Sequence, residues 1–366
     1  MRSGVSRCVL SLWASSVFAA ALFALTSCEK KQDGPAADAS QQISWKMASA
    51  FSGTLPIVGD SGPYFSEKLR RITKGRIDIK FYDPGKLVPA FEVFDAVSQG
   101  SIDSGWTTAA YWQGKIPAAA FFTAVPFGPD TNEYLGWVYE GGGWTLWKEL
   151  YAPHNVMPIP CQLTPPEASG WFKTPITSLD QFRGMKIRYG GMAGMIMQKL
   201  GASVQLLAPG DIYPALERGV IDALEFANPS LDEQLGFQRI AKHYYFPGWH
   251  QPSSMGEFIV NLDRWKSLDP ADQELIETVC QAVIVRDVEI GDFQQIAALQ
   301  RIKDQGVTVH TWPDETLRTF KQAWDEVLAE QSAKDPDFKR VYESYKAYRA
   351  QASAWTKLSR VPASLQ

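Results

Sequence analysis

Cysteine and histidine are scarce in this sequence, with four of each among 366 residues. No pair of them has zinc-finger spacing, and no H-E-x-x-H motif occurs. Cys8 and Cys28 lie near the N-terminus, which leaves Cys161 and Cys280 for the body of the protein. These two can form one disulfide, but isolated cysteines in apolar runs such as "VMPIPCQL" are more often small buried side chains. The sequence leaves their pairing open.

The signatures of common enzyme classes are also missing. There is no G-x-S-x-G elbow, no Walker loop and no EF-hand loop. The stretch "RYGGMAG" approaches a dinucleotide-binding fingerprint, but Tyr189 occupies its first glycine position and the stretch lies mid-chain. Because nothing supplies an activated nucleophile, the sequence predicts a protein without catalysis.

Blocks of one charge sign are absent as well. The chain has 36 basic and 40 acidic residues, and residues 1–27 contain two arginines and no acid. Without that segment, 34 basic residues face 40 acidic ones, a balance of −6. Since no basic patch appears along the chain, nucleic acid is not an expected partner.

The N-terminus reads as a targeting segment. Arg2 and Arg7 precede an uncharged run, "CVLSLWASSVFAAALFAL", and small residues follow. This pattern predicts a secretory signal over 1–27, with an uncleaved membrane anchor as the alternative. The tetrad ending at Cys28 resembles a bacterial lipobox, which implies lipid attachment to that cysteine. Residues 28–42 are polar and small, as in a flexible tether. We expect a lipoprotein tethered in the periplasm.

Two segments of the chain share a plan. Residues 75–106 and 201–226 each contain a β run ("IDIKFY"; "SVQLL"), a Pro-Gly turn, a short helix ("AFEVFDAVSQ"; "IYPALER"), Gly-x-Ile-Asp and a second strand. Such units build parallel sheets covered by helices. Gly100 and Gly219 would end the helices in a left-handed conformation, and Asp103 and Asp222 would have turn or capping roles. Two copies indicate two similar α/β lobes.

The remaining pattern is largely helical. The sequence predicts a first strand at 43–51 and a last one at 307–312. It predicts helices at 60–75, at 132–152 with a break at glycines 141–143, at 269–306, and in two C-terminal segments. We expect lobe I at 43–160 with part of about 265–366, and lobe II at 161–264. The fold class is an α/β, two-lobed periplasmic-binding-protein-like fold with a ligand cleft between the lobes.

Arg188 lies at the end of the predicted strand "MKIRY", and after Tyr189 two glycines follow. The simplest interpretation is that Arg188 forms an ion pair with an acidic residue at the surface. However, apolar neighbours indicate that the strand end is half-buried, and a desolvated guanidinium requires an anion, which a carboxylate matches with two parallel hydrogen bonds. Glu225 also lies at the carboxyl end of a predicted strand, in the second repeat, where Trp106 has the matching place in the first. Ligands of open α/β sheets bind at such carboxyl ends. Glu225 would either pair with Arg188 or bind a hard cation together with Gln162 and backbone carbonyls.

Several of these stretches resemble one known family. They are "GRIDIKFYDPGKLVPAFEVFDAVSQGSIDSGW", "AVPFG", "FRGMKIRYGGMAGMIMQKLGASVQLLAPGDIYPALERGVIDALEFANP" and "KHYYFPGWHQP". Their order and content resemble the extracytoplasmic solute-binding proteins of tripartite ATP-independent periplasmic (TRAP) transporters. The likeness covers nearly all of the chain after the tether. It is nearest to the branch that binds 2-oxo and 2-hydroxy acids such as pyruvate or lactate.

The resemblance implies a capture protein that delivers an organic acid to membrane subunits. It assigns Arg188 to the ligand carboxylate, and it assigns Gln162, the Glu225 carboxylate and the Phe226 carbonyl to a cation that bridges protein and ligand. The branch usually has Trp where Phe226 stands, and Gln251 occupies a position often held by an acid. A neutral amide favours a monovalent ion, so we expect Na⁺, with Ca²⁺ as the alternative. The predicted ligand contacts also include Trp106, Tyr111, Asn228 and Trp249, with Phe51 as a further wall; each aromatic is individually more typical of a core.

Two other functional classes stay open. One is a metal-dependent hydrolase or lyase that uses Glu225 and His250. The other is a sensory module that docks a receptor instead of a transporter. The long C-terminal helix permits a homodimer, as in some relatives. The sequence names neither the acid nor the oligomeric state.

Overall fold

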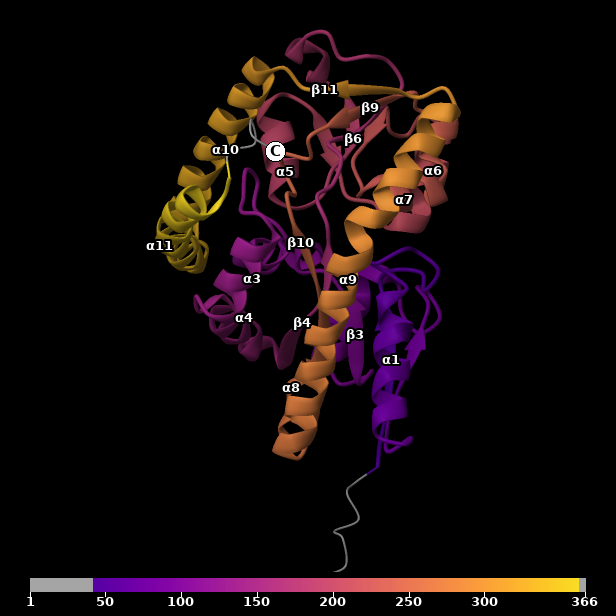
Figure 1. Ribbon diagram of the computed structural model, residues 1–366, viewed down its shortest axis with the longest axis vertical. Helices are drawn as coiled ribbons and strands as arrows, with labels where there is room; N and C mark the ends of the chain where they lie inside the picture. Colours follow the sequence, from indigo (N-terminus) through magenta and orange to yellow (C-terminus); the bar gives the residue numbers. More distant parts are fainter. Residues whose placement is uncertain (1–41, 362–366) are drawn as a thin grey trace, which may run out of the picture. The chain divides into compact units, whose positions relative to one another are not determined.

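The computed structural model describes residues 42–361. The signal segment, nearly all of the tether and Cys28 lie outside the described residues. Two mixed sheets organise the chain (Figure 1). The first has the order β2-β1-β3-β10-β4 and the second the order β11-β9-β5-β8-β6-β7. The strands of the first sheet are β1 (Ile43–Ser49), β2 (Ile77–Tyr82), β3 (Ser104–Thr107), β4 (Val156–Thr164) and β10 (Ser254–Asn261). Those of the second are β5 (Gly170–Phe172), β6 (Lys186–Arg188), β7 (Ser203–Gln205), β8 (Ala223–Leu224), β9 (His243–Phe246) and β11 (Thr308–Thr311).

The two sequence repeats form the parallel parts of the two sheets, as predicted. β1 pairs in parallel with β2 and β3, and β6 pairs in parallel with β7 and β8. Gly100 and Gly219 both have positive φ, 71° and 72°, and follow the helices that they end. Asp103 accepts a hydrogen bond from the Lys46 N–H at 2.7 Å, and Asp222 accepts one from the Lys186 N–H at 3.0 Å. The repeated aspartates therefore tie a neighbouring strand to the end of each unit.

Helices cover both sheets. In chain order they are α1 (Ser61–Ile72), α2 (Val93–Ser98), α3 (Thr131–Tyr139), α4 (Gly143–Tyr151), α5 (Gly191–Lys199), α6 (Pro209–Glu217), α7 (Pro229–Leu235), α8 (Leu262–Lys266), α9 (Pro270–Asp304), α10 (Asp314–Lys334) and α11 (Pro336–Ser359). α6 begins three residues before the expected start, because Pro209 is favoured in a first helical turn. No described helix is long and apolar enough to cross a bilayer.

The chain crosses between the sheets twice by short segments without regular secondary structure. Residues 165–169 lead from β4 to β5, and residues 247–253 lead back from β9 to β10. The two segments run side by side, since the Glu167 N–H donates to the Gln251 carbonyl at 3.2 Å. These crossings, together with the two sheets, give the two-lobed arrangement that the sequence predicts. The lobe boundaries themselves stay a prediction.

The 35-residue helix α9 contacts β4 and α1 and, further towards its C-terminal end, α7 (Figure 1). A disulfide joins its Cys280 to Cys161 of β4. The sequence left this pairing open: the two cysteines are 119 positions apart, and only the fold brings them together. Gly291 of α9 lies against the end of β4, where an added Cβ would come within 3.0 Å of the Pro165 ring.

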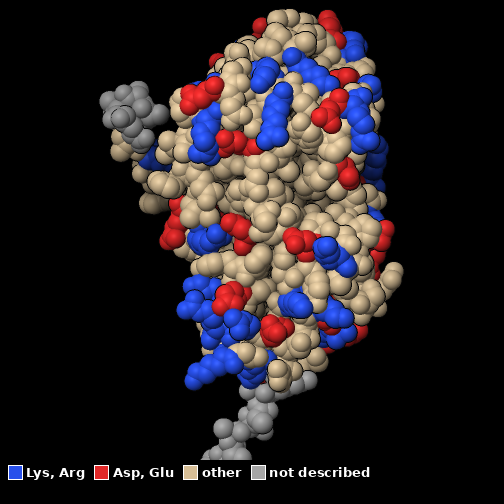
Figure 2. All heavy atoms as spheres, turned by 90° about the vertical axis from the view of Figure 1, so that its right-hand side faces the viewer, with Lys and Arg blue, Asp and Glu red and all other residues tan. Residues whose placement is uncertain are grey.

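The described surface carries charges of both signs. On the face seen in Figure 2, acidic and basic side chains are interspersed over the upper and lower parts, with a more uncharged band between them. The large aromatic side chains are mostly interior; Phe122, for example, stacks on Trp137 and Trp147 at 5.5 and 4.9 Å between ring centroids.

Candidate functional site

Arg188 and Glu225 stand at the carboxyl ends of two neighbouring parallel strands. Arg188 ends β6 and is in register with Leu224 of β8, and Glu225 follows directly. The Glu225 N–H donates to the Arg188 carbonyl at 2.9 Å, which extends the ladder by one step. The sequence-based placement of both residues at one sheet edge is thereby confirmed.

The two side chains form a buried ion pair. Arg188 Nη1 lies 2.9 Å from Glu225 Oε2 and also donates to the Glu225 carbonyl. The side chains are only 4% and 2% exposed. The guanidinium also lies over the Phe226 ring, 5.1 Å from its centroid. The direct pairing that the sequence left open is thus the one observed, and the protein itself neutralises part of the Arg188 charge.

The pairing leaves much of the guanidinium unused. Arg188 Nε is buried and has no hydrogen-bond partner among residues 42–361, and Nη2 makes no hydrogen bond to them either. The pair borders a cavity of about 60 Å³. The cavity is lined by Phe51, Val58, Thr108, Ala110, Tyr111, Thr123, Gln162, Thr164, Glu167, Arg188, Gly190, Gly191, Glu225, Phe226, Ala227, Gln251, Ser254 and Met255. Arg188 therefore faces a small space rather than a fully packed core, with donors to spare.

Glu225 is held in its charged form. Burial by itself would raise its pKa, but the Arg188 charge, the His250 ring and the Gly190 N–H together keep the pKa below its usual value. His250 Nε2 lies 3.2 Å from Glu225 Oε1, and the Gly190 N–H donates to Oε2 at 3.2 Å. An ionised carboxylate thus stands at the cavity wall.

A second carboxyl group, Glu167, comes from the first crossing segment. It accepts a hydrogen bond from Gln251 Nε2 at 3.0 Å. Burial raises the pKa of Glu167 well above its usual value, and the nearby charges of Glu225 and Asp232 raise it further. Ligand atoms of Glu167, Glu225 and His250 all lie within 4.8 Å of one another, which is close enough to surround a single ion.

Gln162 reaches the cavity from β4. Its Nε2 donates to Thr164 Oγ1 at 2.8 Å, and its Oε1 accepts no hydrogen bond from residues 42–361. Gly256 of β10 leaves the room for this side chain, because an added Cβ there would lie 2.3 Å from Gln162 Oε1. The amide oxygen is therefore free to bind a ligand or ion.

The predicted site residues divide into two groups. Arg188, Gln162, Tyr111, Phe51 and all four predicted cation ligands line the cavity. Trp106, Trp249 and Asn228 do not. Trp106 donates from Nε1 to the Val58 carbonyl at 2.8 Å, Trp249 packs on Phe320, and Asn228 Oδ1 accepts from Ser230 Oγ. All three side chains are buried, and for the two tryptophans this is the location that the sequence analysis gave as more typical.

Sequence reasoning missed Glu167 altogether and considered His250 only for a hydrolase. Both lie in the crossing segments, where no periodic pattern marks a residue as buried. The one signal was the stretch "TPPEASG", in which an acid follows two prolines at the end of an apolar strand. An acid at a strand end merits the same attention that Arg188 received.

The fold and this cavity define a class: a two-lobed ligand-binding protein with a buried arginine, partly unpaired, beside an oxygen-rich wall. Residues 49–335 match the family described as "Bacterial extracellular solute-binding protein, family 7". The chain belongs to this family, whose members act in the periplasm and serve TRAP transporters.

Related proteins match this chain in sequence and structure over most of its length. A monocarboxylate 2-oxoacid-binding periplasmic protein of Nostoc sp. is 33% identical over 348 residues, which is 95% of each chain. A TRAP solute-binding protein of Pseudoalteromonas atlantica, solved with sodium and pyruvate, superposes with a TM-score of 0.84 at 32% identity, over 87% of this chain and 97% of the other. One from Colwellia psychrerythraea, solved with calcium and pyruvate, gives 0.83 at 34% identity, over 87% and 98%.

Proposed function

We propose that this protein captures a small 2-oxo or 2-hydroxy monocarboxylate together with a bridging cation, for uptake by a TRAP transporter. The observation that carries the proposal is Arg188, whose Nε and Nη2 remain available beside the cavity. A carboxylate takes two parallel hydrogen bonds from such a fork. The Nostoc, Pseudoalteromonas and Colwellia proteins support the same ligand class.

Charge balance supports a cation as the companion of the acid. Arg188 and ionised Glu225 already cancel, so a carboxylate entering alone would bring an uncompensated charge into a buried space, which is costly. A monovalent cation entering with it restores neutrality. We infer that Na⁺ is the ion, since Gln251 offers an amide in place of an acid; Ca²⁺ is the alternative.

The chain's own donors fit a hard cation. Glu225 supplies a carboxylate, Gln162 a free amide oxygen, Phe226 a backbone carbonyl and Gln251 a further amide, and oxygen atoms are the ligands that Na⁺ and Ca²⁺ prefer. When bound, the cation would neutralise the charge of the acid and would be coordinated by its 2-oxygen. The protein's part is to hold the carboxylate through Arg188 and to exclude water with Phe51, Tyr111 and Phe226.

The size of the cavity favours a small ligand. One water molecule requires roughly 10–15 Å³ of such a space, so a cavity of about 60 Å³ suits a ligand of few atoms. A ligand with so few atoms needs strong contacts per atom to bind tightly. Two hydrogen bonds from Arg188 and a shared cation, both shielded from water by closed lobes, provide them.

The proposal is tested by thermal-shift and calorimetric titration of the full mature chain with pyruvate, lactate and longer 2-oxo acids, each in sodium, in calcium and in a buffer free of both. We expect saturable binding of a small acid that requires a cation. Binding that ignores the cation would refute the bridging role, and the absence of binding by every 2-oxo and 2-hydroxy acid would refute the ligand class.

The cluster of Glu167, Glu225 and His250 is the observation that would favour a hydrolase or lyase, because a histidine and two carboxylates also suit a catalytic transition metal. We propose that the protein is not an enzyme. Incubation with candidate acids and esters in the presence of zinc, followed by mass spectrometry, would reveal turnover if it occurs.

Two further properties belong to the proposal. Lipidation at Cys28 would tether the protein to the membrane, and mass spectrometry of the membrane fraction tests it. A homodimer would form through the end of α11, where Trp355 and Leu358 are 70% and 84% exposed. Light scattering of Trp355→Ser/Leu358→Ser beside the wild type tests the dimer.

The identity of the partner has its own test. Neighbouring genes that encode large and small membrane subunits would indicate a transporter as the partner rather than a receptor.

A further inference from the structure

The strand that carries Gln162 contains an irregularity next to that residue. Along β4 and β10, Gln162 is in register with Gly256 and Pro160 with Glu257, so Cys161 is an extra residue without a partner on β10. This is a β-bulge, and bulges change the direction in which the following side chains point. The cavity residue Gln162 therefore directly follows the bulged position.

The packing on either side of the bulge shows the change of direction. Ile159 and Cys161 belong to one apolar cluster of the core, whereas Leu163 belongs to the other. In a regular strand, residues two apart share a face, so Leu163 would have joined the cluster of Ile159 and Cys161. A slip of the bulge by one residue would reverse the faces again and would turn Gln162 away from the cavity.

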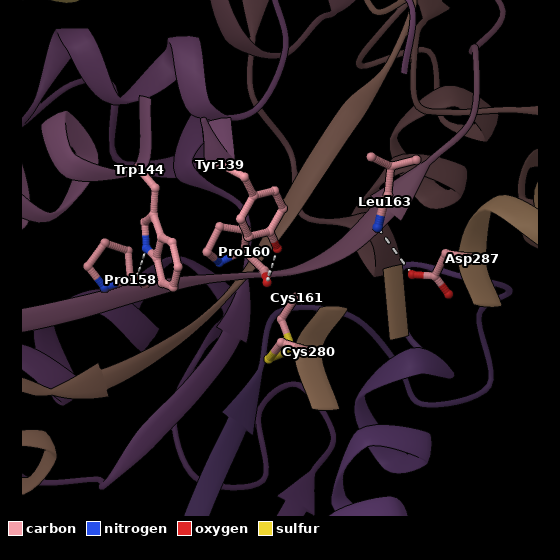
Figure 3. The surroundings of a disulfide bond; sticks show 8 residues. All are labelled: Tyr139, Trp144, Pro158, Pro160, Cys161, Leu163, Cys280 and Asp287. Atoms are coloured by element: carbon pink, nitrogen blue, oxygen red, sulfur yellow. Dashed lines mark hydrogen bonds between the residues drawn. A yellow bond between two sulfur atoms is a disulfide. The ribbon is translucent and has the colours of Figure 1, made fainter. Parts of the chain in front are cut away.

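β4 is the outer strand of its sheet, and β10 is its one neighbour among the described strands. The backbone polar groups of Pro158 and Pro160 face away from β10: Trp144 Nε1 donates to the Pro158 carbonyl at 2.8 Å, and Tyr139 Oη donates to the Pro160 carbonyl at 3.4 Å (Figure 3). Proline is tolerated at such positions of an outer strand because no ladder hydrogen bond is lost. The segment before Gln162 is therefore paired with a neighbouring strand on one side only.

Helix α9 holds the same segment from the other side, at two points that flank Gln162. Cys280 is disulfide-bonded to Cys161, and the Asp287 carboxylate accepts a hydrogen bond from the Leu163 N–H at 3.1 Å (Figure 3). Cys280 and Asp287 are seven residues apart, about two helical turns, so both lie on the side of α9 that covers β4. Asp287 is itself fixed by a hydrogen bond from Ser61 Oγ at 2.6 Å.

From this arrangement we propose that the Cys161–Cys280 disulfide and Asp287 are positioning groups for Gln162. They fix the bulge in β4 and thereby keep the Gln162 amide in the ligand cavity. The inference rests on the proposed function, in which Gln162 contacts the cation and the acid. It predicts that ligand affinity, and not only stability, depends on the oxidised state of a disulfide that does not touch the ligand.

The first test measures pyruvate affinity in sodium by calorimetry, well below the melting temperature of every variant. Partners of this kind typically change affinity 10- to 100-fold. We expect Cys161→Ala/Cys280→Ala, and the wild type reduced by a phosphine, to bind roughly tenfold or more weakly. Asp287→Ala should also weaken binding, whereas Asp287→Asn keeps an acceptor for the Leu163 N–H and should restore most of it. A lower melting temperature with unchanged affinity would overturn the proposal.

The second test separates positioning from general destabilisation. In a Gln162→Ala background, loss of the disulfide should leave the affinity unchanged, because the group being positioned is gone. The same loss of affinity in both backgrounds would contradict the proposal. If Gln162→Ala binds as tightly as the wild type, the proposed contact with Gln162 fails instead. If no acid binds the wild type, a crystal structure of the disulfide-free variant still decides: an unchanged register of 160–162 against 256–257 overturns the inference, and a shifted register supports it.

Discussion

Glu225 Oε2 lies 2.9 Å from Arg188 Nη1, so the group expected to bind the ligand already has an internal counter-ion. The two opposite charges cancel within the pair. Arg188 still has unused N–H donors, and Glu225 still offers its carboxylate. A buried charge without a partner would be costly in the unliganded protein. The pair therefore makes the empty state tolerable while leaving groups for both an anion and a cation.

The first prediction concerns Arg188. Arg188→Lys keeps the charge but removes the planar fork, so pyruvate affinity should fall at least about tenfold. Arg188→Ala should abolish ligand-induced stabilisation, and it should also lower the free energy of unfolding by about 3–5 kcal/mol, because Glu225 is left buried without its partner. Thermal shift with and without ligand measures both effects. Arg183→Ala, at a side chain that is 77% exposed, is the control; intact binding by the Arg188 variants would remove Arg188 from the site.

The second prediction links cation and acid through Glu225. Glu225→Gln removes the one carboxylate that the Arg188 charge keeps ionised at the cavity, so the affinities for sodium and for pyruvate should fall together. Calorimetry across a sodium series measures the linkage. Glu257→Gln, another buried carboxyl away from the cavity lining, serves as a matched control. A variant that loses only its cation dependence while keeping its pyruvate affinity would contradict the bridge.

The third prediction concerns selectivity between ions. Gln251→Glu adds a second carboxylate beside Glu167, which Gln251 contacts at 3.0 Å. A divalent ion gains more than a monovalent one from an added negative ligand, so the ratio of calcium to sodium affinity should rise by about tenfold or more. Ion titrations in the presence of saturating pyruvate give this ratio. An unchanged ratio would show that residue 251 does not reach the ion.

The fourth prediction concerns pH and Glu257. Burial raises its pKa to about 8, although Trp112 Nε1 and Tyr151 Oη donate to its carboxyl. A raised folded-state pKa means that the stability from this group is complete below the unfolded pKa and is lost as pH rises towards 8. Between pH 6 and 8 the wild type should lose up to about 1.4 kcal/mol per pH unit relative to Glu257→Gln.

Chemical denaturation at several pH values measures this difference. Asp232 and Asp287, whose pKa values burial raises to about 7, are present in both proteins and cancel in the comparison. Glu92→Gln, at an exposed position, should follow the wild type at every pH. Parallel stability curves for the wild type and Glu257→Gln would show that Glu257 does not titrate in this range.

Much of the fold follows from local patterns. Hydrophobic periodicity and turn residues indicate the repeated strand-turn-helix units, the glycines that end helices, and the long helices. The positions of these elements were therefore predictable within a few residues. Arg188 and Glu225 were placed correctly for the same reason, since each ends a recognisable strand. The disulfide, the cavity role of Glu167 and the inward turn of Trp106 were not predictable. They depend on contacts between distant segments, and a bulge or a crossing segment leaves no periodic trace.

The contact between Gly291 and Pro165 has a mechanical consequence. Gly291 is the one glycine of α9, and glycine weakens a helix interior, so bending of the helix costs comparatively little there, beside the start of a crossing segment. We expect faster hydrogen exchange around residue 291 when the ligand is absent. If the two sheets move apart when the ligand leaves, α9 should therefore flex near residue 291 rather than near its ends.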